Sequence, residues 1–365
     1  PRLEELIKAQ AYGLGFDLAG ITSLGAVGTA KEFDRWIEQG YAGEMKYLPN
    51  RAATRRDSRL PFPGASSAIV VAMNYGGVSP AGPIARYARG GDYHDLMIDR
   101  LRALGNWLES ELGRGVRSKA YVDTGPLLER DLARKAGLGW FGKNTNLIHP
   151  KLGSFFFLGT LLVELDLAPD EPFDADRCGS CRRCLDACPT GAFVDERVLD
   201  ATRCISYLTI EAKGPIPLEL REKIGDLAYG CDICQDVCPW NVRFARPVRE
   251  SALAARDDLE NPDLTSLLAL DDAGFRERFR DSAIKRAKRR GLARNVAVAL
   301  GNRGDPDSIP ALERALAHDT EPLVRCHAAW ALGRFDSADA RRALEGARLL
   351  DQDPAVMSEI TSALA

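Results

Sequence analysis

The chain has 365 residues and a formal net charge of −3, and 45% of its residues are hydrophobic and 28% are charged, which excludes a disordered protein. Its length exceeds that of a usual single domain and predicts two or three domains. The nearly balanced charge excludes nucleic-acid binding through the whole surface, so any such contact must come from a local basic patch.

The apolar stretches of the chain are too short to span a membrane. The longest, 67–73 and 155–163, fall well below the roughly 20 residues that a spanning helix needs. The first residues, beginning at Pro1, carry charges where a secretory signal has an apolar run. We therefore expect a cytoplasmic protein without a membrane segment, in which the nine cysteines bind metal rather than form disulfides.

Residues 1–168 alternate helical and extended patterns, which predicts an N-terminal α/β domain. In chain order we predict a helix over 1–12, a strand over 16–21, a helix over 31–39, a strand over 67–75, a helix over 93–112, a strand over 117–122, a helix over 127–136 and a strand over 154–165. The strand over 67–75 is uncharged and rich in β-branched residues, so we expect it to be buried. The patterns leave the order of the strands in the sheet open.

Residues 169–245 have a different character, because eight of the nine cysteines fall between positions 178 and 238, among Pro, Gly and Asp. The run C-x2-C-x2-C-x3-C-P over 178–189 has the spacing of bacterial ferredoxins, in which the fourth cysteine binds the other of two [4Fe–4S] clusters. Three thiolates on one tight loop can reach three irons of one cube, whereas the fourth, in the following helix, points away. We therefore predict a small domain that needs its clusters to fold.

A second run, C-x2-C-x3-C-P over 231–239, lacks the leading cysteine of the first run. Cys204 lies 27 residues upstream and is the obvious substitute. Exchange of the fourth ligands between the two runs then predicts the two ligand sets. One cluster is expected on Cys178, Cys181, Cys184 and Cys238, and the other on Cys188, Cys204, Cys231 and Cys234.

Zinc sites and disulfides are the alternative uses of these eight cysteines. Zinc favours paired C-x2-C units, and two such sites could use all eight. Three thiolates within 178–184 are spaced too tightly for a usual zinc ribbon, so we favour two iron–sulfur clusters. The ninth cysteine, Cys326, is predicted to be a buried structural thiol.

Residues 250–365 are rich in Ala, Leu and Arg and contain an internal repeat. The segments 294–301 and 325–333 resemble each other, and their Leu-Gly pairs lie 32 residues apart. Each is followed by a polar loop and a second helix rich in Ala and Leu. Paired helices at this period indicate an α-solenoid of the HEAT type, although two unrelated Ala-rich helices would also fit.

A basic stripe leads into the first of these repeats. Between positions 276 and 294 there are nine Lys and Arg residues against two acids, a local balance of +7. Such a stripe on a helical repeat suits a nucleic-acid backbone, whereas a merely solvated helix face, the alternative, normally mixes both signs. We predict RNA contacts by Lys285, Arg286, Lys288, Arg289, Arg290 and Arg294.

Several blocks outside the cysteine runs have a distinctive order and spacing. They are Y-A-R-G-G-D-Y-H over 87–94, V-D-T-G-P over 122–126, G-W-F-G-K-N over 139–144 and K-R-A-K-R-R-G-L-A-R-N over 285–295. Together with the cysteine runs, these blocks resemble the epoxyqueuosine reductase family over nearly the whole chain. No single block would carry that resemblance.

The resemblance implies a multidomain α/β and α architecture: a cobalamin-binding α/β domain over 1–168, a ferredoxin-like two-cluster domain over 169–245, and a HEAT-like domain over 250–365 that helps dock tRNA. It implies the two-electron deoxygenation of epoxyqueuosine to queuosine at the wobble position of tRNA with a GUN anticodon. Cobalamin would supply low-valent cobalt, and the clusters would relay electrons from an unidentified low-potential donor. Nothing requires more than a monomer.

The resemblance also implies the residues of the site. Asp123 matches the general acid of the family, which would protonate the oxyanion of the opened epoxide if burial raises its pKa. A helix N-cap is the alternative role for Asp123. Contacts to cobalamin or substrate are expected from Tyr93, His94, Asp123, Lys143, Asn144, His149, Ser154, Ser206 and Asp232, with local structural roles as the alternative.

The residues alone do not show cobalamin. The D-x-H-x-x-G motif of other cobalamin enzymes is incomplete, because Asp92 and His94 are followed by Met97 where the glycine should be. A reductive dehalogenase also pairs cobalamin with two clusters, but usually has an export signal and no C-terminal repeats. A simple electron carrier would not need the long N-terminal domain. Both alternatives fit the sequence less well than a tRNA-modifying reductase.

Overall fold

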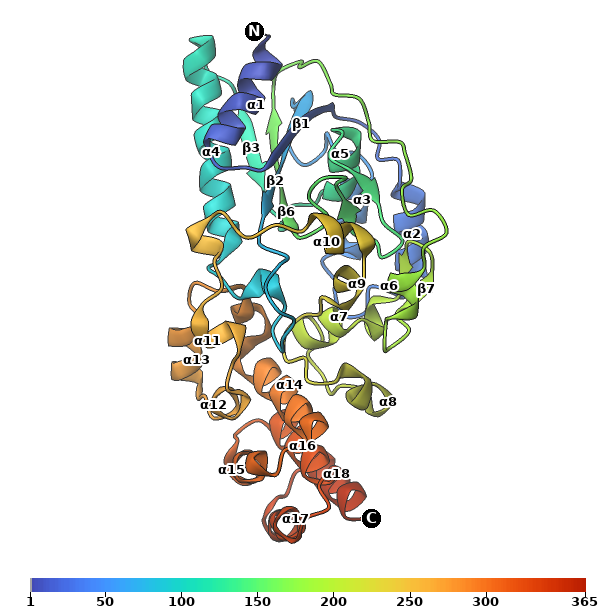
Figure 1. Cartoon of the computed structure of the whole chain (residues 1–365), viewed down its shortest axis with the longest axis vertical. Coiled ribbons are helices and arrows are strands. Elements are labelled where there is room, and N and C mark those ends of the chain that lie inside the picture. The colour runs from blue at the N-terminus through green and yellow to red at the C-terminus, as the bar shows by residue number, and fades with distance from the viewer. Residues whose placement is uncertain (1) are drawn as a thin grey trace.

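The computed structural model describes residues 2–365 and contains three regions in chain order (Figure 1). The first region consists of α1 (Leu3–Gly13), β1 (Leu18–Ser23), α2 (Ala30–Glu38), α3 (Ala52–Arg55), β2 (Ser67–Asn74), α4 (Tyr93–Leu112), β3 (Ser118–Tyr121), α5 (Glu129–Lys135), β4 (Trp140–Phe141), β5 (Leu147–Ile148) and β6 (Phe156–Val163). The eight predicted elements are confirmed with small shifts at their ends, and the predicted helix start at Pro1 lies outside the described residues. Within this range no helix is long and apolar enough to cross a bilayer.

Four strands form one sheet in the order β1-β2-β6-β3, and every neighbouring pair is antiparallel. β2 and β6 lie at the centre, and every residue of β2 is buried. A strand that is covered on both faces needs an apolar residue at almost every position, which explains the uncharged pattern of β2. The shorter β3 lies at the edge and leads into the loop that contains Asp123.

Helices cover both faces of the sheet (Figure 1). On one face α1 and α4 pack against alternate strand residues, with Ile69 and Met97 in one core. On the other face Val70 of β2 and Leu132 of α5 belong to a second core. The period of two along β2 thus divides its side chains between two helical layers.

The second region contains only short elements. They are α6 (Arg183–Asp186), β7 (Phe193–Asp195), β8 (Val198–Leu199), α7 (Ile205–Ile210), α8 (Leu218–Arg221), α9 (Ile233–Asp236) and α10 (Pro239–Phe244). One of its small cores joins Cys238 to Trp140 and Ile148, which belong to the first region. This part of the chain therefore depends on its neighbours for apolar packing.

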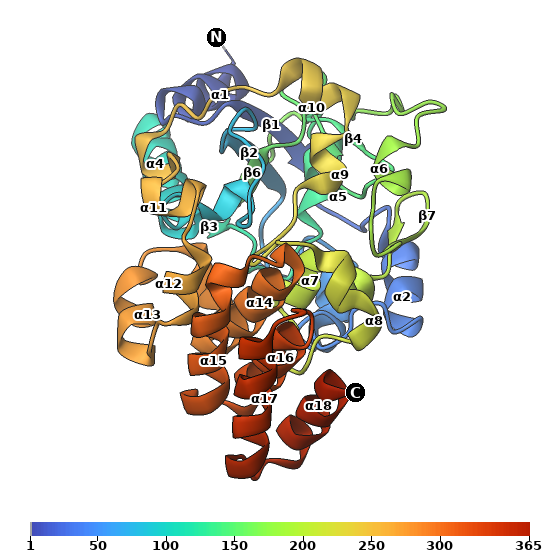
Figure 2. The ribbon, with the colours of Figure 1, turned by 60° about the horizontal axis from the view of Figure 1, so that its bottom comes forward.

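The third region is built of stacked helices (Figure 2). Its helices are α11 (Asp257–Glu260), α12 (Leu264–Leu268), α13 (Asp272–Arg278), α14 (Lys288–Arg303), α15 (Ile309–His318), α16 (Pro322–Leu332), α17 (Ala338–Leu350) and α18 (Pro354–Leu364). The repeated glycines allow neighbouring helices to approach closely: a Cβ on Gly301 would lie 2.8 Å from Ala331, and a Cβ on Gly333 would lie 2.7 Å from Ala363. The predicted helical repeat is confirmed.

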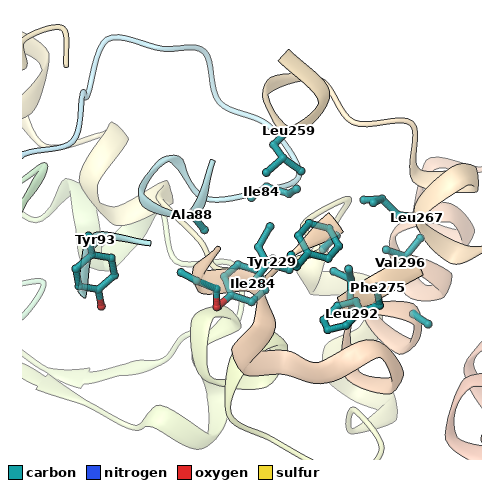
Figure 3. Packing of buried hydrophobic residues seen from close by; sticks show 14 of the residues in the cluster. Ile84, Ala88, Tyr93, Tyr229, Leu259, Leu267, Phe275, Ile284, Leu292 and Val296 are labelled. Atoms are coloured by element: carbon teal, nitrogen blue, oxygen red, sulfur yellow. The ribbon is translucent and has the colours of Figure 1, made fainter. Parts of the chain in front are cut away.

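One continuous core joins the first and third regions (Figure 3). It runs from Ile84 and Tyr93 to Leu292 and Val296. Tyr229 of the second region belongs to the same core, and its hydroxyl donates to a backbone carbonyl just before α14 at 2.6 Å. The three regions therefore pack against one another through a shared core and are not separated by flexible linkers.

Candidate active site and iron–sulfur centres

Asp123 lies in the loop after the edge strand β3, and its backbone is held in a strained conformation. Its φ is 58°, in the left-handed region that residues other than glycine rarely adopt. The backbone N–H of Asp123 donates to Oε1 of Glu129, at the start of α5, at 2.8 Å. The side chain of Asp123 is 66% exposed, so it is free to meet a ligand.

Two residues in the first turn of α4 contact the carboxylate of Asp123. The hydroxyl of Tyr93 donates to Oδ2 of Asp123 at 3.1 Å, and Nε2 of His94 lies 3.5 Å from the same oxygen. The other ring nitrogen of His94, Nδ1, lies 2.7 Å from Oδ1 of Asp92. The ring of Tyr93 stacks on Phe157, with the centroids 3.8 Å apart. The structure thus brings together three of the residues that the sequence singled out.

These contacts place the proton on the histidine. Burial by itself would lower the pKa of His94, but hydrogen bonds to Asp123 and Asp92 outweigh it and raise the pKa to about 9. The same hydrogen bond from His94 lowers the pKa of Asp123. The expectation that burial raises the pKa of Asp123 is therefore wrong, because a neighbouring cation stabilises the carboxylate. At neutral pH the two groups form an ion pair.

A cavity of about 210 Å³ opens beside Asp123, and Tyr93 and Ser154 also line it. Its wall includes residues that the sequence analysis missed, among them Glu129 and Gln235. Burial, and then the charge of Asp123, raise the pKa of Glu129 to about 8. An acid in the first turn of a helix usually just complements the helix dipole, so no sequence signal distinguishes Glu129.

The first group of cysteines surrounds a hollow of about 300 Å³. Cys178, Cys181, Cys184 and Cys238 line it, and we call them the outer cysteine group. Burial and the neighbouring thiols of Cys238 and Cys178 raise the pKa of Cys184. The indole N–H of Trp140 donates to the sulfur of Cys178 at 3.5 Å. The four thiols thus face a common space, with an N–H donor at its edge.

The other four form the inner cysteine group: Cys188, Cys204, Cys231 and Cys234. Burial raises the pKa of Cys231 to about 12, with a further contribution from Cys204. Cys234 lies near both of these and also near Cys184 of the outer group, so the groups are neighbours. Among residues 2–365 no three potential ligands are close enough to hold a single metal ion. In a cube each of the four thiolates binds a separate iron, so such ligands stand farther apart.

The inner cysteine group lies beside the Asp123 cavity. Gln235, which follows Cys234, lines this cavity, and its Oε1 accepts a hydrogen bond from the hydroxyl of Ser154 at 2.8 Å. The amide nitrogen of Gln235 donates to the hydroxyl of Tyr75 at 3.4 Å. Outer group, inner group and cavity therefore follow one another in space.

Each region of the chain matches a family model. Residues 55–124 match "Epoxyqueuosine reductase QueG, DUF1730", residues 177–241 match "4Fe-4S double cluster binding domain", and residues 282–365 match "HEAT repeats". The epoxyqueuosine reductase of Pseudomonas aeruginosa is 44% identical over 346 residues, which are 91% of this chain and 94% of that protein. The chain belongs to the epoxyqueuosine reductase family. The epoxyqueuosine reductase of Escherichia coli is 39% identical over 91% of this chain and 89% of its own length.

Solved structures of epoxyqueuosine reductases share the fold over the whole chain. A crystal structure of epoxyqueuosine reductase with an epoxyqueuosine-modified tRNA-Tyr stem loop is 33% identical and has a TM-score of 0.90, covering 99% of this chain and 98% of that one. A structure of the Bacillus subtilis enzyme has a TM-score of 0.89 at 32% identity, with the same coverage. The predicted fold class, an α/β part with a two-cluster part and helical repeats, is confirmed.

Two of the residues expected to contact cobalamin line the outer cysteine hollow instead of the Asp123 cavity. Lys143 is buried, and its Nζ lies 2.7 Å from a carboxylate oxygen of Glu196. The side-chain amide of Asn144 donates to the backbone carbonyl of Cys234 at 3.2 Å. Both side chains support the loops around the cysteines.

Three other expected contacts are likewise engaged locally. Burial and nearby cations lower the pKa of His149 to about 4, so its ring is neutral and accepts the backbone N–H of Lys151 at 3.2 Å. The side chain of Ser206 lies beside the thiol of Cys204. Asp232 is buried and accepts hydrogen bonds from the backbone and guanidinium of Arg86 at 2.9 and 3.1 Å.

The basic stripe is only partly free to bind tRNA. Arg276, Arg280 and Lys288 are exposed and line a hollow of about 640 Å³, which we call the basic hollow. Lys285 is exposed but lies 2.6 Å from Asp92.

Two further members of the stripe lie near carboxylates. Arg286 is exposed and lies 2.8 Å from Glu211. Arg290 is half exposed, 3.8 Å from an acid just before α16. A phosphate would have to compete with these carboxylates.

Arg289 and Arg294 are buried, and the prediction that they contact RNA is wrong. Arg289 is 7% exposed and makes two hydrogen bonds to Asp319, at 2.8 and 2.9 Å. Arg294 is 1% exposed and donates to three backbone carbonyls in the segment 208–214. Arg289 links two parts of the repeat domain, and Arg294 joins this domain to the second region, so neither guanidinium is free to contact a phosphate.

Proposed function

We propose that this protein reduces the epoxide of epoxyqueuosine in tRNA to the alkene of queuosine. The observation that carries the proposal is the Asp123 cavity beside two cysteine groups, in a chain of the epoxyqueuosine reductase family. The reaction converts one epoxide, two electrons and two protons into one alkene and one water. The cysteine groups suit the electron supply, and Asp123 with His94 suits the proton supply.

We also propose the two ligand sets of the [4Fe–4S] clusters, the outer cysteine group for one and the inner cysteine group for the other. Thiolates in sets of four are the donors that such cubes use, and the thiols within each group are neighbours. Clusters held this close together can exchange single electrons, which suits a two-electron reduction.

We infer that the Asp123 cavity receives the reacting part of a cobalamin. Its wall carries the aromatic rings of Tyr75, Phe156 and Phe157 together with the polar side chains of Arg130 and Asn146. This combination suits a flat macrocycle that bears amide groups at its rim. When bound, cobalamin would supply a low-valent cobalt for activating the epoxide.

Asp123 is proposed as the group that protonates the epoxide oxygen. Opening of the epoxide leaves an oxyanion, which needs a proton before the oxygen can leave as water. Since Asp123 is ionised beside protonated His94, it takes the proton from Nε2 of His94, 3.5 Å away, and passes it to the oxyanion, while the Tyr93 hydroxyl fixes the position of Oδ2. Asp123 thus touches the substrate, and Tyr93 and His94 act through it.

We expect turnover to fall as the pH rises through about 8 to 9. Glu129, with a pKa of about 8, and His94, with a pKa of about 9, are protonated below these values and lose their protons above them. Asp123, Arg130 and protonated His94 are the charged groups near Glu129. Because the reaction consumes two protons, the alkaline limb of the pH–rate profile should report these groups. A rate that stays constant up to about pH 10 would contradict the assignment.

Replacing Cys204 with serine should lower the iron content from about eight to about four atoms per chain, because only the inner cluster loses a ligand. Iron analysis and electron paramagnetic resonance of anaerobic protein measure this. Cys326→Ser is the control, since Cys326 lies in α16, and it should keep the full iron content. A Cys204→Ser protein with both clusters intact would refute the ligand assignment.

If the basic hollow binds tRNA, affinity should fall with salt by about 0.7 to 0.9 log unit per log unit of salt for each phosphate contact. Replacing Arg276, Arg280 and Lys288 with glutamate should weaken tRNA binding and flatten this slope. Iron content should not change, and the same substitution at Arg341 and Arg348 of α17 should have little effect. An unchanged salt slope in the triple variant would mean that the exposed cations of the basic hollow are only solvated.

The proposed function can be tested in cells that lack epoxyqueuosine reductase and accumulate epoxyqueuosine in their tRNA. Expression of this chain should restore queuosine, measured by mass spectrometry of tRNA nucleosides. Persistent epoxyqueuosine in cells that contain the folded, iron-loaded protein would refute the proposal. Since its proposed substrate is tRNA, we place the protein in the cytoplasm, and we expect it to act as a monomer.

A further inference from the structure

Three exposed arginines lie at or next to the outer cysteine group. Arg177 and Arg243 line the same hollow as the four cysteines, and Arg183 is the first residue of α6, directly before one of them. All three are exposed. We call Arg177, Arg183 and Arg243 the arginine rim.

The arginine rim has no acidic partner in the part of the chain that the structure describes. The guanidinium of Arg177 lies over the ring of Phe173, 5.3 Å from its centroid, and that of Arg243 lies 5.2 Å from the centroid of Phe244. By contrast, Arg182 and Arg197 of the same region are paired with Asp186 and Asp176. The rim is therefore a free positive surface on a chain whose net charge is −3.

Apolar side chains accompany these charges. Val242 on α10 is 73% exposed, and the half-buried rings of Trp240 and Phe244 line the outer hollow. A small apolar centre within a charged rim is the usual composition of a protein–protein contact. A free phosphate or another small anion would gain nothing from these apolar side chains, so they indicate a protein partner.

The arginine rim stands at the outer end of the electron path. The inner cysteine group borders the Asp123 cavity through Gln235, whereas the outer group opens at the rim. Figures 1 and 2 both show α6 and α10 on the side of the molecule away from α13. Because α13 contributes Arg276 to the basic hollow, a tRNA bound there would leave the arginine rim free.

We propose that the arginine rim docks the electron donor, and that this donor is a carrier protein with an acidic surface around its redox group. The inference rests on the proposed function, because only a reductase needs such a donor. Opposite charges would speed the encounter and orient the carrier, while the apolar centre would exclude water from the contact. A one-electron carrier would dock twice for each product and lose one electron to the cysteine-bound clusters each time.

The test compares two reductants on anaerobic protein that holds its clusters. One is reduced plant-type [2Fe–2S] ferredoxin, an acidic one-electron carrier, and the other is dithionite, which needs no docking site. The variant carries Arg177→Glu, Arg183→Glu and Arg243→Glu. Stopped-flow absorbance gives the rate of cluster reduction, and titration with oxidised ferredoxin gives the affinity without any turnover.

Ferredoxin should reduce the variant at least about ten-fold more slowly than the wild type, and the dependence of this rate on salt should largely disappear. Ferredoxin affinity should fall in parallel. Dithionite should reduce both proteins to the same extent, with equal iron content. The matched control Arg314→Glu, Arg341→Glu and Arg348→Glu changes the same charge on exposed arginines of α15 and α17 and should behave like the wild type.

Equal ferredoxin rates in variant and wild type would overturn the docking proposal. So would a loss of tRNA affinity with unchanged ferredoxin rates, which would make the rim an RNA surface. If the charge-reversal variant contains less iron than the wild type, the test is repeated on the variant with Arg→Gln at the same three positions. Ferredoxin should again reduce this variant more slowly than the wild type, although the difference should be smaller. Failure of the proposed function is a different result: dithionite would reduce the wild-type clusters, but epoxyqueuosine in tRNA would remain unchanged.

Discussion

Asp123→Asn is expected to lower the rate of queuosine formation by about two to four orders of magnitude, the usual effect of losing a general acid. Asparagine has the size of aspartate and can still accept the hydrogen bond from Tyr93, but it cannot transfer a proton. It also tolerates the backbone φ of 58° at this position, since asparagine is enriched in left-handed conformations. Single-turnover assays read by nucleoside mass spectrometry measure the rate.

The variant should fold, hold both clusters and bind tRNA like the wild type, so the loss is confined to chemistry. Asp95→Asn is the matched control, because Asp95 is an exposed acid in the first turn of α4, which also contains His94. It removes an equal charge and should leave the rate unchanged. A near-normal rate for Asp123→Asn would assign Asp123 to a capping or turn role, which asparagine fills about as well.

Arg294→Met is expected to destabilise the protein by about 3 kcal/mol or more, since a buried acceptor left without a donor costs about 1 to 3 kcal/mol. Arg294 donates to three backbone carbonyls of the segment 208–214 and to Asn295. Burial lowers its pKa to about 10, so it remains charged at neutral pH. Methionine fills the space but satisfies none of the carbonyls. Urea unfolding followed by circular dichroism measures the change.

Arg290→Met on the same helix is the control. Arg290 is half exposed, so its replacement should change the free energy of unfolding by no more than about 0.5 kcal/mol. The folded fraction of Arg294→Met should bind tRNA normally. Unchanged stability together with weaker tRNA binding would restore Arg294 to the RNA-binding surface.

The sequence was sufficient where a local cause determines the structure. α4 was predicted with its observed bounds because Asp92 caps the first turn and Gly113 ends the helix in the left-handed conformation. The cysteine spacing grouped the thiols because ligand distance along the chain limits their reach in space. The Leu-Gly repeat predicted the helical repeats correctly because Gly301 and Gly333 each lie close against the next helix.

The sequence was insufficient where the partner is far away along the chain. Arg294 belongs to a run of cations, and only the folded segment 208–214 reveals that it is buried. The same applies to the antiparallel strand order, which depends on pairing between β2 and β6, far apart in the chain.

The sequence placed the proton of the candidate site on Asp123 instead of His94 for a related reason. The pKa of Asp123 depends on His94, which belongs to a different element and stands 3.5 Å away only after folding. Glu129 was missed because its raised pKa comes from burial in a cavity that no sequence motif predicts. The pKa values of Asp123 and Glu129 could therefore be assigned only from the structure, although Asp123 itself could be chosen from the sequence.

The most direct test of this account uses the purified wild-type chain, loaded anaerobically with its clusters and cobalamin and reduced with dithionite. It is incubated with tRNA that contains epoxyqueuosine, and the nucleosides are analysed by mass spectrometry. We expect epoxyqueuosine to lose the mass of one oxygen atom and become queuosine, with two electrons consumed per product. Reduced clusters together with unchanged epoxyqueuosine would contradict the account.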